Sequence, residues 1–449
     1  MKELSFDVVI VGAGPAGLFA AIELIKGKND LKIALIDMGK RVKERSPKEV
    51  MSGVGGGGCF SDGKLHFSPV LSHEILMEFI SREEVENLCN YVDSVFTEFG
   101  VDADYYPKHE KEAQDMVDRC RLAGVDLVTR RVRHVGSDIL PTIIEKMENF
   151  LIDNGVNLFT ETTINDFIVD DGKIKGVVNS DIRFLAKHVI AAPGRIRARW
   201  MQKKAEELGI KFSYQPVEVG VRVEFPDYVM KKFSDLLYEG IFLVYTDSFD
   251  DVVRTFCPCP NGKVATETYD DFVCVNGHST TDYSSPNSNF ALVQEVKLTK
   301  PVENTIAYAK SIAELATTIG GGKPILQRYK DLKKFRRSTW KRLEKSFVKP
   351  SLTEVVPGDI SMAFPHRIVT NLIEAIEKLA VVMPGINSDS TLLYAPEIKL
   401  RSSKIETDEH METKVKNLYV AGDGVGLSGN IVGAAVTGVI AARGILGKQ

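Results

Sequence analysis

Three glycines and an aspartate near the N-terminus have the residue types and spacing of a site for a dinucleotide diphosphate. Gly12, Gly14 and Gly17 form a GxGxxG pattern, and Asp37 stands 20 residues beyond Gly17. In this pattern the first glycine permits a tight turn, the second lets the backbone approach a pyrophosphate, and the third lets a helix pack on a strand. The helix N-terminus supplies N–H donors to the phosphate, while the carboxylate accepts from a ribose hydroxyl. The segment is therefore predicted to bind a dinucleotide.

The elements that must position these residues are visible around them. Residues 6–11 (FDVVIV) and 32–36 (KIALI) are short apolar runs, typical of strands buried on both faces. The intervening LFAAIELIK is helix-like. Strand, glycine turn, helix, strand and acid together make a complete βαβ unit.

A second strand-like run near the C-terminus distinguishes between dinucleotides. Residues 418–423 (LYVAGD) end in Gly422 and Asp423, and Gly429-Asn430-Ile431 leads into a helix of small residues. FAD exceeds NAD by a ribityl chain and a flavin ring, so it needs a carboxylate for hydroxyls and backbone donors for the flavin pyrimidine. Asp423 and the N–H groups near Asn430 fit these needs, although an exposed turn aspartate is the alternative. The pattern favours FAD.

Between these segments lies a glycine-dense loop, residues 51–64 (MSGVGGGGCFSDGK), which can approach a ligand closely because glycine has no Cβ. Arg41 and Arg45 follow Asp37. Either arginine could meet the adenosine phosphate or ribose, or could belong to a solvated charge cluster.

The chain resembles the flavoproteins of the glutathione-reductase superfamily, and more narrowly the uncharacterised FAD-dependent dehydrogenases that are similar to NAD/FAD-utilising dehydrogenases. The narrower resemblance is carried by FSDGKL at 60–65, GVRVE at 220–224, RTFC at 254–257, YAPE at 394–397 and the Gly-Asp segment. One departure is AAPGR at 191–195, where that family more often has a Gly-His-Ser-Ala run.

The resemblance implies flavin contacts from the glycine loop, at Gly56, Gly57, Ser61 and Lys64. Lys64 would stabilise an anionic reduced flavin by its charge, or would face solvent. The full set of expected cofactor contacts is Gly12, Gly14, Pro15, Ala16, Gly17, Asp37, Met38, Arg45, Gly56, Gly57, Ser61, Lys64, Ala192, Gly194, Gly422, Asp423, Gly429, Asn430 and Ile431.

A flavin enzyme also needs a group that moves a proton beside the hydride path. We expect Lys64, His134 and Tyr394 to be the catalytic residues, with His366 as a further pocket candidate; a structural role for His134 is the alternative. Cys257-Pro-Cys259 is either a redox pair or a packing element, and Cys59 stands next to the expected flavin loop. No Cys/His set has metal-ligand spacing, so no metal is predicted.

The predicted fold class is α/β, α+β overall, with a discontinuous Rossmann-type FAD-binding domain. That domain is expected at 1–73, 131–204 and 385–449, with a helical insertion at 74–130 and an inserted mixed β-sheet substrate domain at 205–384. No second strand-GxGxxG-helix unit occurs; Gly320-Gly321-Gly322 follows a helix-like run. NAD(P)H, if it is the external reductant, would bind without a Rossmann domain of its own.

The composition limits which classes of partner and which cellular compartment are expected. The 57 Lys and Arg against 61 Asp and Glu give a net charge of −4, so nucleic acid is not an expected partner. Six Cys and an N-terminus without signal-peptide features indicate a cytoplasmic protein. The uncharged stretch 424–442 contains five Gly, so it is predicted to be a glycine turn with a packed helix and not a membrane span.

One segment has a much more positive charge than the nearly neutral chain as a whole. Residues 328–349 (RYKDLKKFRRSTWKRLEKSFVK) are strongly basic. They would bind an anionic substrate or partner, or form a solvated helix face with Phe335, Trp340 and Leu343 turned inward; the second interpretation is favoured.

The expected function is that of an FAD-dependent dehydrogenase or reductase, moving hydride or electron pairs between bound flavin and a small organic substrate. An electron-donor protein is an additional partner to consider. One alternative is a reductase of isolated C=C bonds, as in geranylgeranyl-reductase-like proteins. Another is a flavin-dependent RNA-modifying enzyme or an FAD-bound scaffold without turnover.

Overall fold

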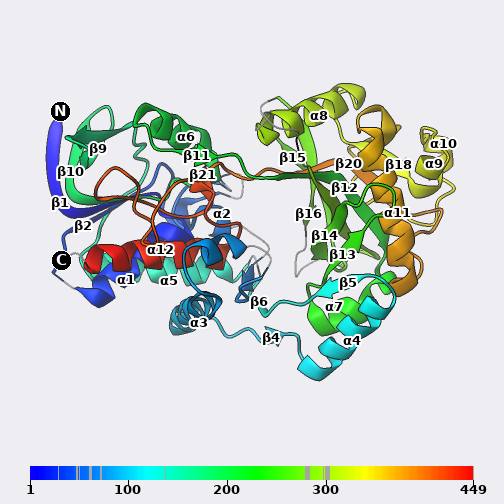
Figure 1. Cartoon of the computed structure of the whole chain (residues 1–449), viewed down its shortest axis with the longest axis horizontal. Helices are drawn as coiled ribbons and strands as arrows, with labels where there is room; N and C mark the ends of the chain where they lie inside the picture. Colours follow the sequence, from blue (N-terminus) through cyan, green and yellow to red (C-terminus); the bar gives the residue numbers. More distant parts are fainter. Residues whose placement is uncertain are drawn as a thin grey trace. The chain divides into compact units, whose positions relative to one another are not determined.

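The computed structural model divides the chain into two units of a mixed α/β fold, which confirms the predicted fold class. It describes residues 1–28, 30–46, 49, 51–59, 63–70, 73–136, 138–269, 271–278, 284–296, 298 and 304–447. The first unit comprises Met1–Asp104, Arg131–Gln215 and Arg401–Gln449, and the second comprises Tyr105–Arg130 and Pro216–Leu400. Figure 1 shows the two ends of the chain, blue and red, within the first unit.

The first unit is built on a sheet in which β7, β2, β1, β10 and β22 are parallel. An antiparallel hairpin of β8 and β9 extends it beside β10. Its strands are β1 (Lys2–Val11), β2 (Ile33–Ile36), β7 (Asn157–Phe159), β8 (Asp166–Asp170), β9 (Lys173–Val178), β10 (Ile182–Ala191) and β22 (Leu418–Val420). The strand order reverses at β1, and in open α/β sheets ligands bind beyond the carboxyl ends of the strands at such a point.

Helices and short strands complete the first unit. These are α1 (Pro15–Gly27), α2 (Gly56–Cys59), α3 (Arg82–Glu98), α5 (Leu140–Asp153), α6 (Ala198–Glu207), α12 (Ile431–Leu446), the 3₁₀ turns η1 (Val42–Glu44), η2 (Glu74–Glu78), η3 (Arg195–Arg197) and η6 (Asp423–Val425), and the strands β3 (Lys64–His66), β6 (Val132–His134), β11 (Phe212–Ser213) and β21 (Lys404–Ile405).

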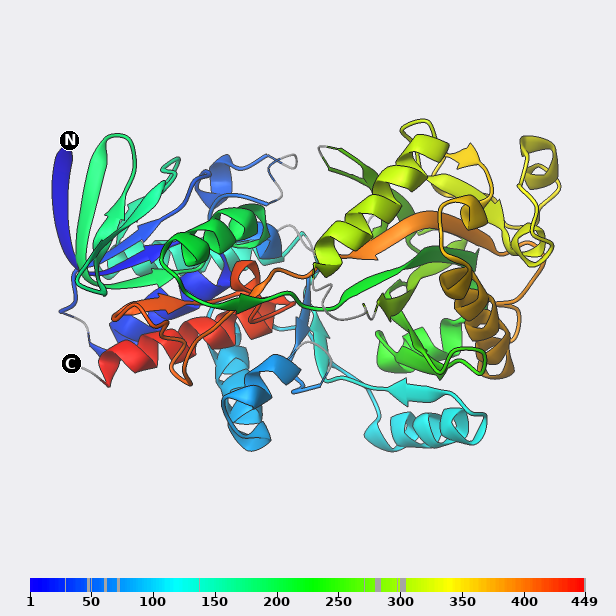
Figure 2. The same cartoon turned by 45° about the horizontal axis from the view of Figure 1, so that its top comes forward.

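Helices α1 and α12 lie side by side, as Figures 1 and 2 both show. A Cβ added at Gly438 of α12 would lie 2.0 Å from the Ala16 carbonyl oxygen of α1. The two backbones therefore touch because Gly438 has no side chain. The uncharged stretch that resembled a membrane span forms η6 and most of α12, and none of the helices in the described ranges is long and apolar enough to cross a bilayer.

The second unit is built on a largely antiparallel sheet with the order β19-β18-β20-β12-β17-β14-β13-β5. Its strands are β4 (Tyr105–Tyr106), β5 (Asp126–Val128), β12 (Val217–Pro226), β13 (Ile241–Tyr245), β14 (Val252–Cys259), β15 (Lys263–Thr268), β16 (Val273–His278), β17 (Asn287–Val296), β18 (Ile325–Arg328), β19 (Val356–Pro357) and β20 (Leu392–Lys399). Its helical elements are α4 (Glu110–Leu122), η4 (Asp227–Val229), α7 (Lys231–Leu237), α8 (Thr305–Ile319), α9 (Tyr329–Lys333), α10 (Trp340–Leu343), η5 (Ile360–Met362) and α11 (His366–Val382).

Successive side chains of β12 point to opposite faces of this sheet, and the two faces differ in polarity. Val217, Val219, Val221, Val223 and Phe225 point into one apolar core with side chains of α8 and α11. The intervening side chains of β12 are polar but are also buried, and the β15–β16 hairpin packs near them. A buried polar face must satisfy its charges internally or through a ligand.

The unit boundaries differ from the domain boundaries predicted from sequence. Segment 74–130 is divided, because α3 packs in the first unit, with Phe96 against Phe19, whereas α4 belongs to the second. Residues 385–400 also belong to the second unit, because β20 pairs with β12 and β18. Helical periodicity and short apolar runs identify elements, but they do not show which core or strand each element meets.

The contact between α1 and α12 leads to a prediction about the stability of the first unit. Gly438→Ala is expected to destabilise the first unit by about 1–3 kcal/mol, because the new methyl forces the helices apart. Gly447→Ala at the end of α12 is the matched control, since its Cβ would meet only ordinary contacts at 3.5 Å and its φ is −70°. Thermal unfolding followed by circular dichroism measures both. Equal midpoints for the two variants would contradict the packing argument.

Candidate functional site

In the glycine turn after β1, one of the three glycines has open space where a side chain would stand. A Cβ at Gly12 would lie 2.0 Å from the Ala192 carbonyl oxygen, and one at Gly17 would lie 1.9 Å from the Gly12 carbonyl oxygen. At Gly14 the nearest atom is Gly56 Cα, at 3.9 Å. The fold itself therefore requires Gly12 and Gly17, whereas the space beside Gly14 is what a closely approaching ligand needs.

Helix α1 begins at this open position. Gly14 is its N-cap, makes no side-chain cap in the described structure, and is followed by Pro15 at the first helical position. The first-turn N–H groups of a helix lack intrahelical acceptors, and Gly14 has no side chain that could cap those of Ala16 and Gly17. Such a terminus, with its positive helix dipole, suits a phosphate.

Asp37 joins three backbone segments at the end of β2. Its carboxylate accepts hydrogen bonds from the N–H groups of Ala13, Gly39 and Gly53, each at 2.8 Å. A carboxylate offers about four acceptor positions, so one is left for a ribose hydroxyl. Asp37 is thus fixed between the glycine turn and the glycine loop, with the half-buried Met38 beside it.

Arg45 holds the glycine loop in place. The buried guanidinium donates to the carbonyl oxygens of Val54 at 2.6 Å, Glu49 at 2.8 Å and Gly56 at 3.1 Å. Arg41 instead pairs with Glu148 of α5. The shown contacts make Arg45 a positioning residue for the loop, a role that its spacing from Asp37 did not suggest.

Helix α2, which contains Gly56 and Gly57, lies between the starts of two longer helices. A Cβ on Gly58 would lie 3.0 Å from Pro15 Cγ and 3.2 Å from Ile431 Cγ1. The N-termini of α1 and α12 therefore converge on this glycine loop. Ser61 and the side chain of Cys59 lie outside the described part of the structure.

The turn after β22 closes the same region. Gly422 has φ 84°, and its added Cβ would lie 3.1 Å from Ala16 Cβ. A Cβ on Gly424 would lie 2.2 Å from the Gly194 carbonyl oxygen. The Asp423 carboxylate pairs with Arg195, a partner that sequence reasoning missed. Segments from the beginning, middle and end of the chain thus meet at one cradle.

At the start of α12, two buried polar atoms have no hydrogen-bond partner among the described residues. Asn430 caps the helix by accepting from the Gly433 N–H at 2.7 Å, while its Nδ2 is buried and makes no hydrogen bond to any described residue. Ser428 Oγ is also buried, and it has no hydrogen-bond partner among the described residues. Gly429 between them is exposed. Buried groups of this kind indicate a bound ligand or water, so the cradle fits a group with polar edges at this end.

Two of the expected catalytic residues are neighbours. Lys64 on β3 stands opposite His134 on β6 in an antiparallel pair, and β3 packs against α12. Lys64 is buried and His134 is half-buried. Directly opposed residues have Cβ atoms about 4.5–5.5 Å apart. A buried His73, missed from sequence, lies over Gly433, whose added Cβ would be 2.9 Å from His73 Cδ2.

Tyr394, the third expected catalytic residue, lies in the second unit on β20. Its hydroxyl donates to the Glu224 carboxylate, which also accepts from Asn287 Nδ2 at 3.0 Å and the Ser351 N–H at 3.2 Å. Burial, together with the Glu224 charge, raises the pKa of Tyr394 well above its usual value. Such a hydroxyl is poorly matched to proton transfer near neutral pH. His366, at the start of α11, is exposed.

The buried polar face of the second unit centres on Arg222. Its Nε donates to Asn289 Oδ1 at 2.7 Å and its Nη2 to the Cys257 carbonyl oxygen at 2.7 Å and to Cys259 Sγ at 3.2 Å. Glu397 Oε1 lies 3.5 Å from Arg222 Nη1 and 2.6 Å from Lys399 Nζ. Burial alone would lower the pKa of Arg222 and Lys399, but Glu397 outweighs it and raises both pKa values.

Several atoms of this ionic cluster lack hydrogen bonds. Within the described residues, Asn289 Nδ2 and Glu397 Oε2 have none, and Arg222 Nη1 and Glu397 Oε1 have only the ion pairs given above, although all three side chains are fully buried. Cys257 and Cys259 lie beside this cluster and are not joined in a disulfide, and Cys257 has φ 45° at a β-bulge. The described part of the chain contains no group of His, Cys, Asp and Glu placed to hold a metal.

The chain is similar to a protein of known sequence, to several solved structures and, in one part, to a family model. The chain is 23% identical, over 488 aligned positions, to an uncharacterized protein of Clostridium beijerinckii; the match covers 100% of this chain and 82% of the relative. Among solved structures it is similar to E. coli quinol fumarate reductase FrdA, with 15% identity, a TM-score of 0.45 and coverage of 100% of this chain and 71% of the other. It is also similar to glycine oxidase from Bacillus cereus, with 14% identity, a TM-score of 0.40 and coverage of 99% and 96%. Residues 216–400, nearly the whole second unit, match the family model described as "FAD-dependent protein, C-terminal domain-like".

Proposed function

We propose that the first unit binds FAD and that the protein is an FAD-dependent oxidoreductase acting on a small organic substrate. The observation that carries this proposal is the cradle in which a Cβ is tolerated at Gly14 but not at Gly12 or Gly17. The match of residues 216–400 to the C-terminal domain of an FAD-dependent family supports it from the other unit.

Each part of FAD has a proposed partner in the cradle. The pyrophosphate would lie at the N-terminus of α1 beside Gly14, and the adenosine ribose would donate to Asp37. Asp423 would accept from the ribityl hydroxyls. The flavin pyrimidine edge would meet Asn430 Nδ2, Ser428 Oγ and the N–H groups that begin α12, where the helix dipole favours negative charge.

Bound FAD supplies the chemistry of hydride or electron-pair acceptance and donation. The chain's own residues would orient the reacting groups and offset the charge that develops on them. Lys64 would offset negative charge near the flavin, and His134, on the neighbouring strand, would hold or move the proton. Tyr394 is the weaker proton-transfer candidate, because its hydroxyl is already committed to Glu224.

The ionic cluster of the second unit suggests the substrate's polarity. We propose that this face binds the substrate, since Arg222 Nη1, Asn289 Nδ2 and Glu397 Oε2 have no hydrogen bond in the described structure. Charged donors and acceptors suit a small polar molecule better than a hydrocarbon chain. This argues against the reductase of isolated C=C bonds. NAD(P)H, or an electron-donor protein, is the proposed external reductant, and the cytoplasm the proposed compartment.

The glycine cradle generates the first functional prediction. Gly14→Ala is expected to leave the thermal stability of the flavin-free protein unchanged, because the protein itself has room for the methyl group. The methyl would crowd the pyrophosphate at a cost of about 1–3 kcal/mol, which corresponds to about a five- to 150-fold weaker FAD affinity. Fluorescence titration with FAD measures this. Gly17→Ala is the comparison and should lower stability as well; unchanged affinity for Gly14→Ala would refute the cradle.

Asn430 can be tested without removing the cap of α12. Asn430→Asp keeps an oxygen acceptor for the Gly433 N–H but replaces the unpartnered Nδ2 donor with an acceptor. The variant is expected to retain stability and to bind FAD about tenfold or more weakly, since a hydrogen bond is replaced by repulsion between acceptors. Asn430→Ala, which loses the cap, should lower stability by about 1 kcal/mol. An Asp variant with full flavin content would exclude Nδ2 as a flavin contact.

Lys64 is tested by the reduction potential of the bound flavin. Replacing the ammonium by Lys64→Met removes an interaction worth about 1.5–3 kcal/mol with the reduced, anionic ring, so the two-electron potential should fall by about 30–65 mV. Lys64→Arg should restore most of the shift. Equal potentials in all three proteins would show that Lys64 does not contact the flavin, and a thermal-unfolding measurement checks that Lys64→Met remains folded.

A further inference from the structure

The basic segment 328–349 does not form the single solvated helix that its composition favoured. It forms two short helices, α9 and α10, joined by a loop. Of the three residues expected to turn inward, only Leu343 is buried; Phe335 is 62% exposed and Trp340 is 51% exposed. The expectation for Phe335 and Trp340 was therefore wrong, and the cause is a buried carboxylate.

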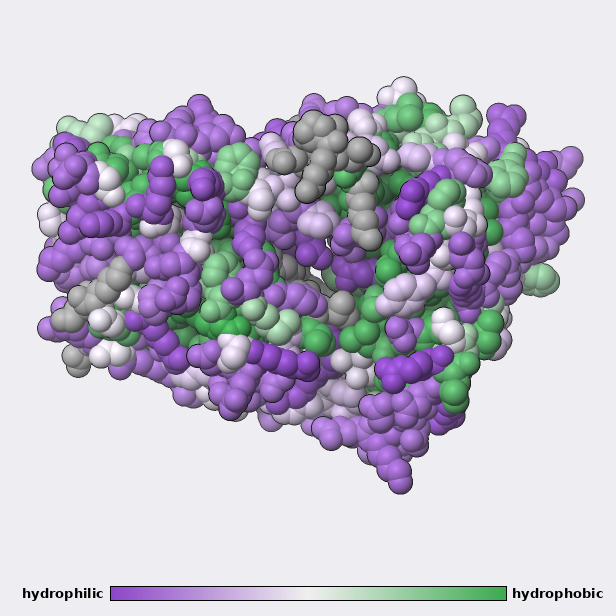
Figure 3. All heavy atoms as spheres, viewed as in Figure 1, coloured by the Kyte–Doolittle hydropathy of each residue, from purple (hydrophilic) through white to green (hydrophobic). Residues whose placement is uncertain are grey.

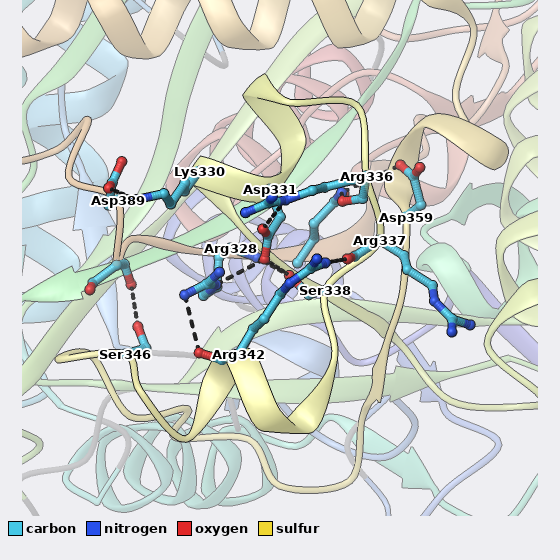
Figure 4. A network of polar contacts seen from close by, with 12 residues as sticks. Arg328, Lys330, Asp331, Arg336, Arg337, Ser338, Arg342, Ser346, Asp359 and Asp389 are labelled. Carbon is cyan, nitrogen blue, oxygen red and sulfur yellow. Dashed lines mark hydrogen bonds and ion pairs between the residues drawn. The ribbon is translucent and has the colours of Figure 1, made fainter.

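Asp331 folds this segment back on itself, as Figure 4 shows. The fully buried carboxylate accepts from Arg328 Nε at 2.9 Å, Arg336 Nε at 2.8 Å and Ser338 Oγ at 2.8 Å. Burial acts to raise the pKa of Asp331, but these hydrogen bonds outweigh it and hold the pKa below its usual value. Arg342 Nη1 donates to the Arg337 carbonyl oxygen at 2.6 Å, which fixes the second half of the loop.

Six of the ten cations in the segment are used within the protein. Arg328 and Arg336 bind Asp331, Lys330 pairs with Asp389, Lys333 pairs with Glu377, and Arg342 and Lys349 donate to carbonyl oxygens. The side chains of the other four, Lys334, Arg337, Lys341 and Lys345, are exposed and have no ion pair or hydrogen bond with any described residue. The fold thus leaves a fixed excess of positive charge on this surface.

Three aromatic side chains stand among these free cations. Phe347 is 93% exposed, more than any other large hydrophobic side chain in the described structure, and Phe335 and Trp340 are also exposed. We call Lys334, Phe335, Arg337, Trp340, Lys341, Lys345 and Phe347 the cationic-aromatic patch. Figure 3 shows mainly hydrophilic residues on the surface where Figure 1 labels α9 and α10.

We propose that the cationic-aromatic patch docks the protein onto an anionic phospholipid bilayer. Projecting Phe and Trp rings insert at the boundary between headgroups and acyl chains, while Lys and Arg beside them meet lipid phosphates. Single-stranded RNA is the other polyanion to consider, but base stacking uses aromatic rings as platforms. A ring that is 93% exposed, as in Phe347, has almost no protein behind it. Insertion into lipid needs only that the ring protrude.

The test is flotation of the full-length protein with vesicles. Vesicles of phosphatidylcholine mixed with phosphatidylglycerol are expected to carry the protein, and pure phosphatidylcholine vesicles are not. Binding should weaken as salt is raised, because exposed charges are screened. The assay requires neither FAD nor turnover, so its outcome is independent of the proposed function.

A double variant locates the docking surface. Lys345→Glu with Phe347→Ser should reduce partition to the anionic vesicles by about tenfold or more, since one cation alone contributes about a fivefold effect. Lys111→Glu with Leu122→Ser is the matched control on α4, where Lys111 is exposed and Leu122 is 89% exposed. It should bind like the parent protein, and both variants should unfold at the parent temperature.

Three outcomes would overturn the proposal. They are no flotation with anionic vesicles, equal partition to neutral and anionic vesicles, and equal losses in the two double variants. A fluorescently labelled single-stranded RNA is the competing probe. If RNA bound through Lys345 and Phe347 and vesicles did not, the patch would be a nucleic-acid surface instead.

Discussion

The close approach of backbone segments around the first glycine turn is the constraint on which the rest of the first unit depends. Gly12 touches the residue after β10, Gly17 touches Gly12, and Gly438 brings α12 onto the start of α1. These contacts place the N-termini of two helices beside one glycine loop. Since each terminus offers N–H groups and a positive dipole, their convergence creates one anion-attracting cradle from three distant parts of the chain.

The second unit is constrained differently. The first unit depends on glycines that let backbones touch, whereas the second unit contains charged side chains that are buried. Val221 and its neighbours on β12 fill an apolar core, while Arg222 and Glu224 between them fill a polar one. Glu224 is satisfied by Tyr394, Asn287 and Ser351, but Glu397 Oε2 and Asn289 Nδ2 have no hydrogen bond within the described structure. A buried charge left partly unsatisfied is costly to stability, and this cost is the reason for the proposal that the cluster binds a ligand.

Local spacing was enough to predict the cradle, and long-range pairing limited the rest. Gly12, Gly14, Gly17 and Asp37 lie within one βαβ unit, so their relation follows from sequence. Lys64 and His134 are 70 residues apart, and nothing local indicated that β3 and β6 pair them. Tyr394 lies in the segment 385–449 that was expected in the FAD-binding domain, but β20 joins the second sheet. Phe335 and Trp340 fit a helical stripe, until Asp331 gathers Arg328 and Arg336 and breaks it.

The measurement that tests the central claim most directly is identification of the cofactor in the purified full-length protein. The protein would be denatured, and the released small molecules separated and compared with FAD, FMN and NAD by absorbance and mass. We predict that FAD is released, and that protein stripped of it takes up FAD again in preference to FMN. A colourless protein that releases no flavin and does not bind added FAD would contradict the account.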